Sequence, residues 1–471
     1  MPQRQLEFVA PDQVVERGLG EIRVRLRIPE GFPAEVLDDA RSIEPDLPDE
    51  DHTDIPFVTI DPPGSRDLDQ ALHIERRGDG YRVRYAIADV GAFVTSGRPL
   101  DDEARERGLT MYGPDLRSPL YPGILSEGMA SLLPDEPRPA LVWNLDLNQA
   151  GEPIDVDLRR AMVRSRGQYD YASVQGQLDD GTAPTPLRLL AEVGRLRRLL
   201  EQERGGVSLP IPDQQVAPYN GGWRLEYQSP LPVEGWNAQI SLLTGMVAAD
   251  LMIEAGIGLL RTLPPARQED IDRMRRIARA LEIAWPAHVG YPELVRSLDS
   301  GMPAHAAMLA EATTLFSGAS YQVLEPGTEV QRHAALATTY THTTAPLRRL
   351  VDRFVGEACL AICAGRDVPE WVSEALPTLP LSMARARSIS GNYEAACLNL
   401  VEAAVLSGKE GQTFTGVIVD VDRDDPHGEV HLRHPAVHAR IDGAGLALGD
   451  EIAVRLIEAS VEDRRVVFAP V

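Results

Sequence analysis

Three aspartates that follow a short apolar segment constrain the fold of this chain more than any other feature of its sequence. Residues 57–60 are apolar, and Asp61, Asp67 and Asp69 fall within the next nine positions. If the segment is extended, Asp67 and Asp69 project to the same side, and the Pro-Pro-Gly turn at 62–64 can fold Asp61 back toward them. Carboxylates held this close repel one another, so the fold must supply cations.

The cluster therefore predicts a divalent-metal site. Oxygen ligands favour Mg²⁺, with Mn²⁺ as an alternative. A pair of such ions assists phosphodiester hydrolysis in many nucleases. The spacing does not fit a calcium-binding EF-hand loop, which needs alternating aspartates, a central glycine and a terminal glutamate. The competing interpretation is a solvated turn capped by aspartate.

A second candidate site lies in residues 340–353. Thr344 or a neighbour can cap a helix that has Pro346 in its first turn. Arg348 and Arg349 then lie near the helix N-terminus, where backbone N–H groups and guanidinium groups bind phosphate. The alternative is an arginine pair held by Asp352 and neighbouring acids, and the residues alone leave both open.

The middle of the chain has the pattern of a mixed α/β domain that ends near residue 405. Residues 71–77 and 81–92 flank Gly-Asp-Gly, which is typical of a β-hairpin. Residues 186–203 and 268–283 have helical spacing of Leu, Ile, Met and Arg. Acidic residues interrupt the apolar stretch 238–260, so we expect a buried helix there and no membrane span.

The tail of the chain has a different pattern. Its five short β-rich runs, separated by glycine-containing turns, are 414–421, 429–433, 437–441, 451–457 and 465–468. Five short strands suit a small OB-type barrel, a fold that often binds oligonucleotides, although a barrel without a ligand has the same pattern. The expected fold class is α+β multidomain: a mixed α/β catalytic domain followed by an all-β OB-fold barrel.

Charge and cysteine content limit the functions to consider. The formal net charge is −24, whereas nucleic-acid-binding surfaces are usually basic, so any RNA-binding site must depend on local residues. The three cysteines are too few for a disulfide framework. Cys359 and Cys363 are one helical turn apart, but no second pair at metal-binding spacing accompanies them, so we expect them to pack in the core.

Together these segments resemble the RNB catalytic domain shared by ribonuclease II, ribonuclease R and the eukaryotic exosome nuclease. The family motif Ile-Asp-x5-Asp-x-Asp-Asp-Ala corresponds here to Ile60-Asp61-x5-Asp67-Leu68-Asp69-Gln70-Ala71. Residues 85–94, 100–115 and 125–134 resemble the segments that follow this motif. Residues 340–352 resemble the family's Thr-Ser-Pro-Ile-Arg-Arg helix entrance. With the OB-like tail, the resemblance covers about residues 35–471.

The resemblance implies a processive, hydrolytic 3′→5′ exoribonuclease that degrades single-stranded RNA to nucleoside 5′-monophosphates. It assigns Asp61, Asp67 and Asp69 to the metal site, and gives Asp67, Asp69 and Arg348 catalytic roles. Gln70 occupies the fourth acidic position, where an amide oxygen can still bind a hard cation. A carboxylate at that position would be expected to raise the affinity for Mg²⁺.

The resemblance also implies contacts to RNA. Tyr112 falls where the family places an aromatic side chain that stacks near the 3′ end, and Arg348 matches the arginine at the scissile phosphate. Thr344 and Arg349 belong to the same helix entrance, and Glu394 matches an acidic residue near the active site. A second stacking aromatic is missing, because Leu209 aligns with its position.

The expected domains are a short N-terminal region of uncertain fold at 1–50, the RNB catalytic domain at 51–407 and the OB-fold RNA-binding domain at 411–471. Residues 1–50 are too few for the two cold-shock barrels that usually precede Asp61 in the family. We expect a cytoplasmic monomer whose partner is single-stranded RNA, without a membrane; no protein partner can be inferred. The alternatives are a non-catalytic RNA-binding protein and a DNA exonuclease on the same fold.

Overall fold

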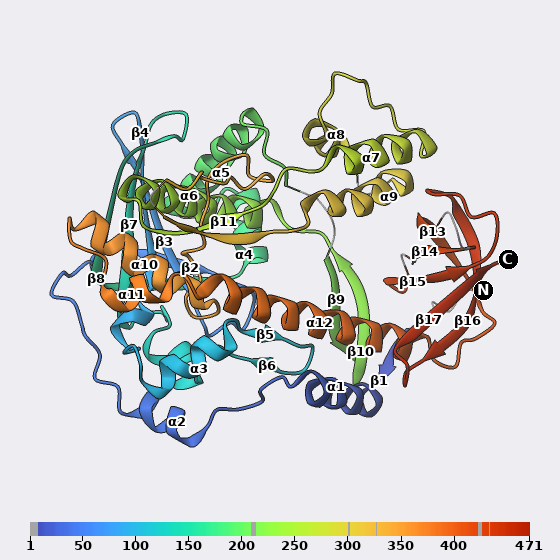
Figure 1. Cartoon of the computed structure of the whole chain (residues 1–471), viewed down its shortest axis with the longest axis horizontal. Helices are drawn as coiled ribbons and strands as arrows, with labels where there is room; N and C mark the ends of the chain where they lie inside the picture. The colour runs from blue at the N-terminus through green and yellow to red at the C-terminus, as the bar shows by residue number, and fades with distance from the viewer. Residues whose placement is uncertain (1–7, 209–212, 300–301, 326, 423–425, 433) are drawn as a thin grey trace.

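The predicted hairpin around residues 78–80 forms part of a five-stranded closed barrel. In the computed structural model, which describes residues 8–208, 213–299, 302–325, 327–422, 426–432 and 434–471, this barrel lies at one end of the molecule (Figure 1). Its strands are β2 (Phe57–Ile60), β3 (Gln70–Arg77), β4 (Gly80–Ala88), β7 (Pro137–Leu147) and β8 (Pro153–Tyr169). Gly80 is required at the turn, because a Cβ there would lie 2.0 Å from the Leu147 carbonyl oxygen.

Helices cover this barrel and share its core. They are α4 (Tyr171–Asp179), α5 (Thr185–Glu203), α6 (Pro232–Ala255), α10 (Leu350–Cys363) and α11 (Glu370–Ala375), with the two-stranded sheet β11 (Gly258–Thr262) and β12 (Ser320–Leu324) beside them. By length and composition α6 is apolar enough to cross a membrane, but 56% of its most apolar window is buried inside the protein. The prediction of a buried helix is thus confirmed. Cys359 is buried and Cys363 is half-buried, and both are free thiols on α10.

A second barrel closes the C-terminal end of the molecule. It consists of β13 (Thr413–Val421), β14 (His427–Leu432), β15 (Val437–Asp442), β16 (Glu451–Ser460) and β17 (Arg465–Pro470). These five strands confirm the predicted OB-like barrel. Between the two barrels lie α7 (Gln268–Ala280), α8 (Tyr291–Ser297), α9 (Pro303–Ala312) and the short turn η3 (Thr313–Phe316). Val417 and Val419 of β13 share a hydrophobic cluster with these helices.

The helix α12 (Leu379–Leu406) runs along the molecule from the first barrel to the second (Figure 1). Its C-terminal half shares a hydrophobic cluster with the second barrel and with α1 (Asp12–Leu26). The same cluster includes residues of the three-stranded sheet formed by β1 (Ala10–Pro11), β10 (Gly222–Gln228) and β9 (Asp213–Tyr219). The sequence left the fold of residues 1–50 uncertain, and the structure forms α1 and α2 (Ala34–Arg41) there.

Short elements complete the wall of the first barrel. They are η1 (Val90–Ala92), α3 (Pro99–Arg107), the paired strands β5 (Met111–Tyr112) and β6 (Arg117–Ser118), and η2 (Leu125–Met129). Apart from β6, these elements fall in or at the edge of the segments 85–94, 100–115 and 125–134 that resemble the family. Together with the loop between β2 and β3, β5, β6 and η2 enclose the pocket described next.

Candidate active site

The loop between β2 and β3 lines a pocket of about 500 Å³. Leu68 in this loop is fully buried, and its N–H donates to Ser131 Oγ at 2.9 Å. Anchoring Leu68 inward leaves its neighbours Asp67 and Asp69 to line the pocket. The lining residues are Asp61, Pro62, Pro63, Gly64, Ser65, Arg66, Asp67, Asp69, Gln70, Tyr112, Arg117, Glu127 and Arg348.

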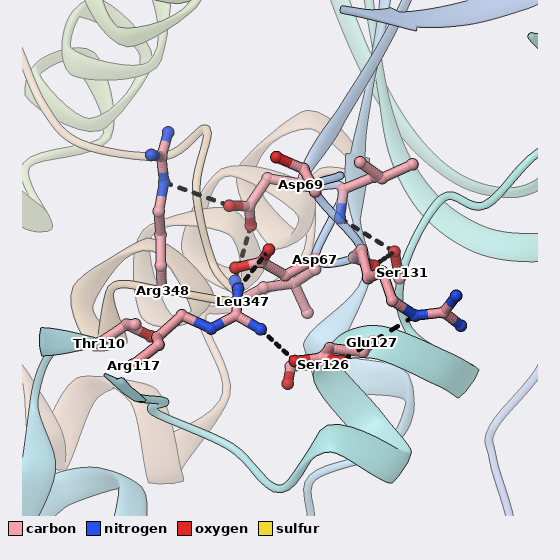
Figure 2. A network of polar contacts seen from close by, with 12 residues as sticks. Asp67, Asp69, Thr110, Arg117, Ser126, Glu127, Ser131, Leu347 and Arg348 are labelled. Carbon is pink, nitrogen blue, oxygen red and sulfur yellow. Dashed lines mark hydrogen bonds and ion pairs between the residues drawn. The ribbon is translucent and has the colours of Figure 1, made fainter. Parts of the chain in front are cut away.

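Asp69 connects the aspartate loop to the arginine segment (Figure 2). Its Oδ1 accepts a hydrogen bond from the Leu347 N–H at 2.7 Å, and its Oδ2 lies 3.3 Å from Arg348 Nε. Asp69 is 4% exposed, and this burial raises its pKa to about 7, against the opposing effect of Arg348. Two motifs that are distant in the sequence thus meet at one carboxylate.

Asp61 and Asp67 differ in their surroundings. Burial, opposed by Arg348 and reinforced by the neighbouring Asp67, raises the pKa of Asp61 to about 6. Asp61 Oδ2 is buried and has no hydrogen-bond partner among the described residues. Asp67 Oδ1, in contrast, lies 2.5 Å from a terminal nitrogen of Arg117. Arg117 also pairs with Glu127, so this arginine lies between two carboxylates (Figure 2).

The donor chemistry of the pocket fits a divalent cation. Four carboxylates and three guanidinium groups line it, and the orphaned Asp61 oxygen is an available hard ligand. Within the described residues, however, no three His, Cys, Asp or Glu side chains converge closely enough to hold one ion. The ion pairs explain this spread, because Asp67 is turned toward Arg117 and Asp69 toward Arg348. A cation at Asp67 would have to compete with Arg117.

Gln70 also lines the pocket, at the first position of β3. Its amide nitrogen donates to the Thr344 carbonyl oxygen at 2.5 Å, and its Oε1 accepts from the Tyr85 hydroxyl at 2.8 Å. Both ends of the amide are therefore engaged by protein groups. The ligand role implied for Gln70 by the family resemblance stays a prediction.

The arginine segment differs from the predicted helix entrance. The helix α10 begins at Leu350 and not at Pro346. Arg349 is extended, with φ −142° and ψ 118°, because its backbone forms a β-bridge with Leu109. The Arg348 and Arg349 N–H groups donate to the Ala345 carbonyl oxygen and close a turn before the helix, so both arginines precede the first helical turn.

The two arginines point to different partners. Arg348 lines the pocket and its side chain is 50% exposed. Arg349 instead pairs with Asp352 through Nε at 2.5 Å and a terminal nitrogen at 2.7 Å. The competing interpretation, an arginine held by Asp352, is therefore correct for Arg349, while Arg348 has the placement expected of a phosphate contact.

Of the other predicted RNA contacts, only some lie at the pocket. Tyr112 lines the pocket and is 45% exposed, as a stacking residue requires. The side chain of Thr344 is buried, and its carbonyl oxygen is bound by Gln70. Glu394 is exposed on α12, accepts a hydrogen bond from Ser390 at 2.9 Å, and does not belong to the pocket lining. Leu209 lies outside the described residues.

Sequence reasoning missed Arg66, Arg117 and Glu127, which line the same pocket. Glu127 lies in the segment 125–134, which was recognised only as a family-like stretch. Arg117 carries no motif of its own. A signal was available in the acidic cluster itself, because repelling carboxylates need nearby cations, but the sequence does not indicate which arginine supplies the charge.

Comparisons with known proteins agree with this geometry. Residues 49–362 match the RNB domain family, and residues 412–471 match the RNase II-type exonuclease C-terminal S1 domain. The chain is 27% identical to Ribonuclease R of Escherichia coli over 94% of its own length and 60% of that protein. It is 25% identical to the human Exosome complex exonuclease RRP44 over 68% of its length and 35% of that protein. The chain thus spans only part of these relatives.

Solved structures share the fold at lower identity. Mycoplasma genitalium RNase R in complex with ribose methylated single-stranded RNA superposes with a TM-score of 0.88, at 18% identity, over 97% of this chain and 78% of that one. Yeast Ssd1, described as a pseudonuclease, superposes with a TM-score of 0.74, at 16% identity, over 93% of this chain and 57% of that one. The fold therefore occurs both in RNA-degrading enzymes and in a protein described as inactive.

Proposed function

Because the chain belongs to the RNB-domain family and carries its C-terminal S1 domain, we propose that it is a 3′→5′ exoribonuclease that hydrolyses single-stranded RNA to nucleoside 5′-monophosphates. The observation that carries this proposal is the pocket in which Asp61, Asp67 and Asp69 face Arg348. Carboxylates and a guanidinium group around one cavity suit binding of a phosphodiester together with divalent cations.

In this reaction, water adds to the last phosphorus and the bond between that phosphorus and the preceding O3′ breaks. The released nucleotide keeps the phosphate at its 5′ end, and the shortened RNA ends in a new 3′ hydroxyl. A divalent cation, Mg²⁺ or Mn²⁺, held by Asp61, Asp67 and Asp69 would supply positive charge and make a nearby water more acidic. Glu127 is a further carboxylate at the pocket.

The side chains of the chain have distinct roles in this proposal. Arg348 offsets negative charge on the phosphoryl oxygens as it develops, through a planar donor fork. Asp69 orients Arg348, because its Oδ2 is paired with Arg348 Nε. Tyr112 stacks on a base near the 3′ end and holds the strand in register. The S1 domain gathers RNA outside the pocket, as OB-folds commonly do.

A time course on single-stranded RNA tests the function. RNA labelled at its 5′ end is incubated with Mg²⁺ and, in parallel, with EDTA. We expect stepwise shortening from the 3′ end with Mg²⁺ and none with EDTA, and no shortening of a DNA of the same sequence. Binding of the RNA without nucleotide release would contradict the proposal and favour a non-catalytic RNA-binding protein on the same fold.

A further inference from the structure

The Gln70 amide is the central link of a hydrogen-bonded chain whose directions are fixed by chemistry. A carbonyl oxygen only accepts, so the amide nitrogen of Gln70 must face Thr344 O, 2.5 Å away. Its Oε1 then accepts from the Tyr85 hydroxyl at 2.8 Å. Since that hydroxyl has one proton, it must accept from Ser241 Oγ, which is also 2.8 Å away. This series of hydrogen bonds connects α6, β4 and β3 to the turn before α10.

This series of hydrogen bonds holds one end of the short turn that carries Arg348. Other ties of the turn include the Ala345 N–H, which donates to Asp352 Oδ1 at 2.8 Å, and the Leu347 N–H, which donates to Asp69 Oδ1 at 2.7 Å. At the far end of the turn, the Arg348 carbonyl oxygen accepts from the Thr110 N–H at 2.9 Å. Gln70 therefore fixes the carbonyl that immediately precedes these tied residues. No regular helix fixes the backbone here, since α10 begins only at Leu350.

We propose that Gln70 is a positioning residue, which uses its amide N–H to hold the Thr344–Arg348 turn so that Arg348 faces the substrate phosphate. The inference rests on the proposed function for the role of Arg348. It replaces the ligand role that the family resemblance implied for Gln70.

The chemistry explains why an amide occupies a position that carries an aspartate in the family motif. A carboxylate can accept but not donate, so it would place one acceptor against another at Thr344 O and leave that buried carbonyl without its partner. It would also add a fifth carboxylate to a pocket that already has four against three guanidinium groups. The amide makes the tie and adds no charge.

The direct test is Gln70→Glu, which keeps the size of the side chain and its acceptor but removes the donor. We expect kcat to fall by about 10-fold to 100-fold, the range for leaving a buried polar group without its partner. The KM for RNA should rise much less than kcat falls, and the Mg²⁺ concentration for half-maximal rate should stay close to the wild-type value. Gln70→Asp should likewise give no lower Mg²⁺ requirement.

The matched control is Gln322→Glu. The Gln322 amide also donates to a backbone carbonyl, that of Glu329 at 2.8 Å, and accepts from the Gln331 N–H at 2.9 Å. It ties β12 to the following loop and does not line the pocket. The same substitution there should leave kcat unchanged, so a loss confined to Gln70→Glu supports the proposal.

A double-mutant cycle shows whether Gln70 acts through Arg348. In an Arg348→Ala background, Gln70→Glu should lower kcat by less than about 3-fold, because the effects of residues that act through one another are not additive. A loss of the same size in both backgrounds would overturn the proposal. So would a Gln70→Asp enzyme that retains kcat and needs less Mg²⁺, because that result identifies position 70 as a metal-ligand position.

The outcome can be separated from failure of the proposed function. If the wild-type protein releases no nucleotide, the function is wrong, and the tie is tested by the affinity for a single-stranded RNA oligonucleotide in EDTA. Gln70→Glu should then weaken RNA binding in the wild type but not in Arg348→Ala. Equal weakening in both would contradict the proposal that Gln70 positions Arg348. If Gln70→Glu does not fold, Tyr85→Phe, which removes the hydroxyl that orients the amide, should give a smaller loss that again disappears in Arg348→Ala.

Discussion

At the scale of single residues, Asp69 joins two motifs that are 278 positions apart in the sequence. Its carboxylate binds the Leu347 N–H and faces Arg348, so it organises the arginine segment as well as the predicted cation site. Replacing it with an isosteric amide keeps an acceptor for Leu347 but removes the charge. This separation of geometry from charge makes Asp69 the most informative position for a first mutation.

We expect Asp69→Asn to retain RNA binding and to lose cleavage by about 100-fold or more, the scale seen when a preorganised electrostatic contact is removed. Nucleotide release measures the rate, and fluorescence anisotropy with a single-stranded RNA measures the affinity. The control is Asp146→Asn, which changes a buried, arginine-paired aspartate on β7 outside the pocket. Turnover close to that of the wild type would remove Asp69 from the catalytic site.

The second residue-scale prediction concerns Arg348→Lys. Lysine keeps the positive charge but loses the planar fork, so kcat should fall much more than affinity if the contact strengthens as phosphoryl charge develops. Steady-state kinetics separate the two parameters. Arg349→Lys is the contrasting variant: because Arg349 pairs with Asp352 inside the protein, it should lower the melting temperature. Equal kinetics for lysine and arginine at 348 would show that only a general positive charge is needed.

The residues of the site were predictable to the extent that they belong to motifs. Asp61, Asp67, Asp69, Tyr112 and Arg348 line one pocket as expected. Arg117 and Glu127 were not predicted, because their approach to Asp67 depends on β5, β6 and η2 folding over the loop. The sequence also left the partner of Arg349 open, since adjacent arginines diverge only once the backbone between them is known. The hydrogen bond from Gln70 to Thr344 was unpredictable for a similar reason, because the two residues come together only in the tertiary fold.

At the scale of elements, helices and strands with regular hydrophobic periodicity were predicted correctly. Local signals such as Pro346 did not predict where a helix begins. The five C-terminal strands and the helices α5 and α7 were predicted from spacing alone. The predicted helix with Pro346 in its first turn begins too early, because Arg349 is held extended by its bridge with Leu109 and α10 begins at Leu350. The helix α1 was missed because it contains Gly18 and Gly20, which disfavour helices. The need for glycine at position 18 is visible only in the tertiary structure, where a Cβ would lie 2.6 Å from the Leu400 side chain of α12.

One prediction concerns the junction between α9 and the C-terminal barrel. Glu311 of α9 is buried beside Arg273 of α7, and Asp420 of β13 faces the same arginine. Burial, reinforced by Asp420 and opposed by Arg273, raises the pKa of Glu311 to about 7. The folded state therefore keeps a proton that the unfolded chain loses above its ordinary pKa of about 4.5, so this group lowers stability as pH rises through that window.

We expect Glu311→Gln to reduce this loss. The amide imitates the protonated acid, so the melting temperature of the variant should fall less than that of the wild type as pH rises from about 5 to about 8. Near the acidic end the two proteins should be similar, and above neutral pH the variant should be the more stable. Thermal unfolding across the pH series measures the difference. Parallel curves would mean that Glu311 ionises normally at the junction.

At the scale of the whole molecule, the C-terminal barrel is not an independent appendage. It shares one hydrophobic cluster with α1, β10 and the end of α12, and a second with α7, α8 and α9. The second strand of the barrel, β14, places His431 against Tyr227 of β10. Hydrophobic packing thus crosses the expected domain bounds of 51–407 and 411–471, which stay a prediction. Sequence pattern identified the barrel but not the surfaces that it buries.

This packing sharpens the last prediction, which removes the residues from Gln412 onward. We expect the truncated protein to melt at a lower temperature, because deletion uncovers the faces of α9 and α12 that contact the barrel. It should also lose much of its preference for long RNA, since the barrel is proposed to gather RNA outside the pocket. The two effects are separated by comparing kcat/KM for two substrates in one preparation. One RNA is shorter than the roughly 4–16 nucleotides that an OB-fold covers, and the other is longer.

The fraction of folded enzyme scales both rates equally, so it cancels in the ratio of the long-substrate to the short-substrate kcat/KM. If the barrel gathers RNA, this ratio falls in the truncated protein while cleavage of the short RNA per folded molecule persists. If the barrel serves only to stabilise the catalytic domain, both rates fall together and the ratio is that of the full chain. The latter result would move RNA gathering to other surfaces, of which residues 1–50 are the first to test, because α1 lies against the same cluster as the barrel.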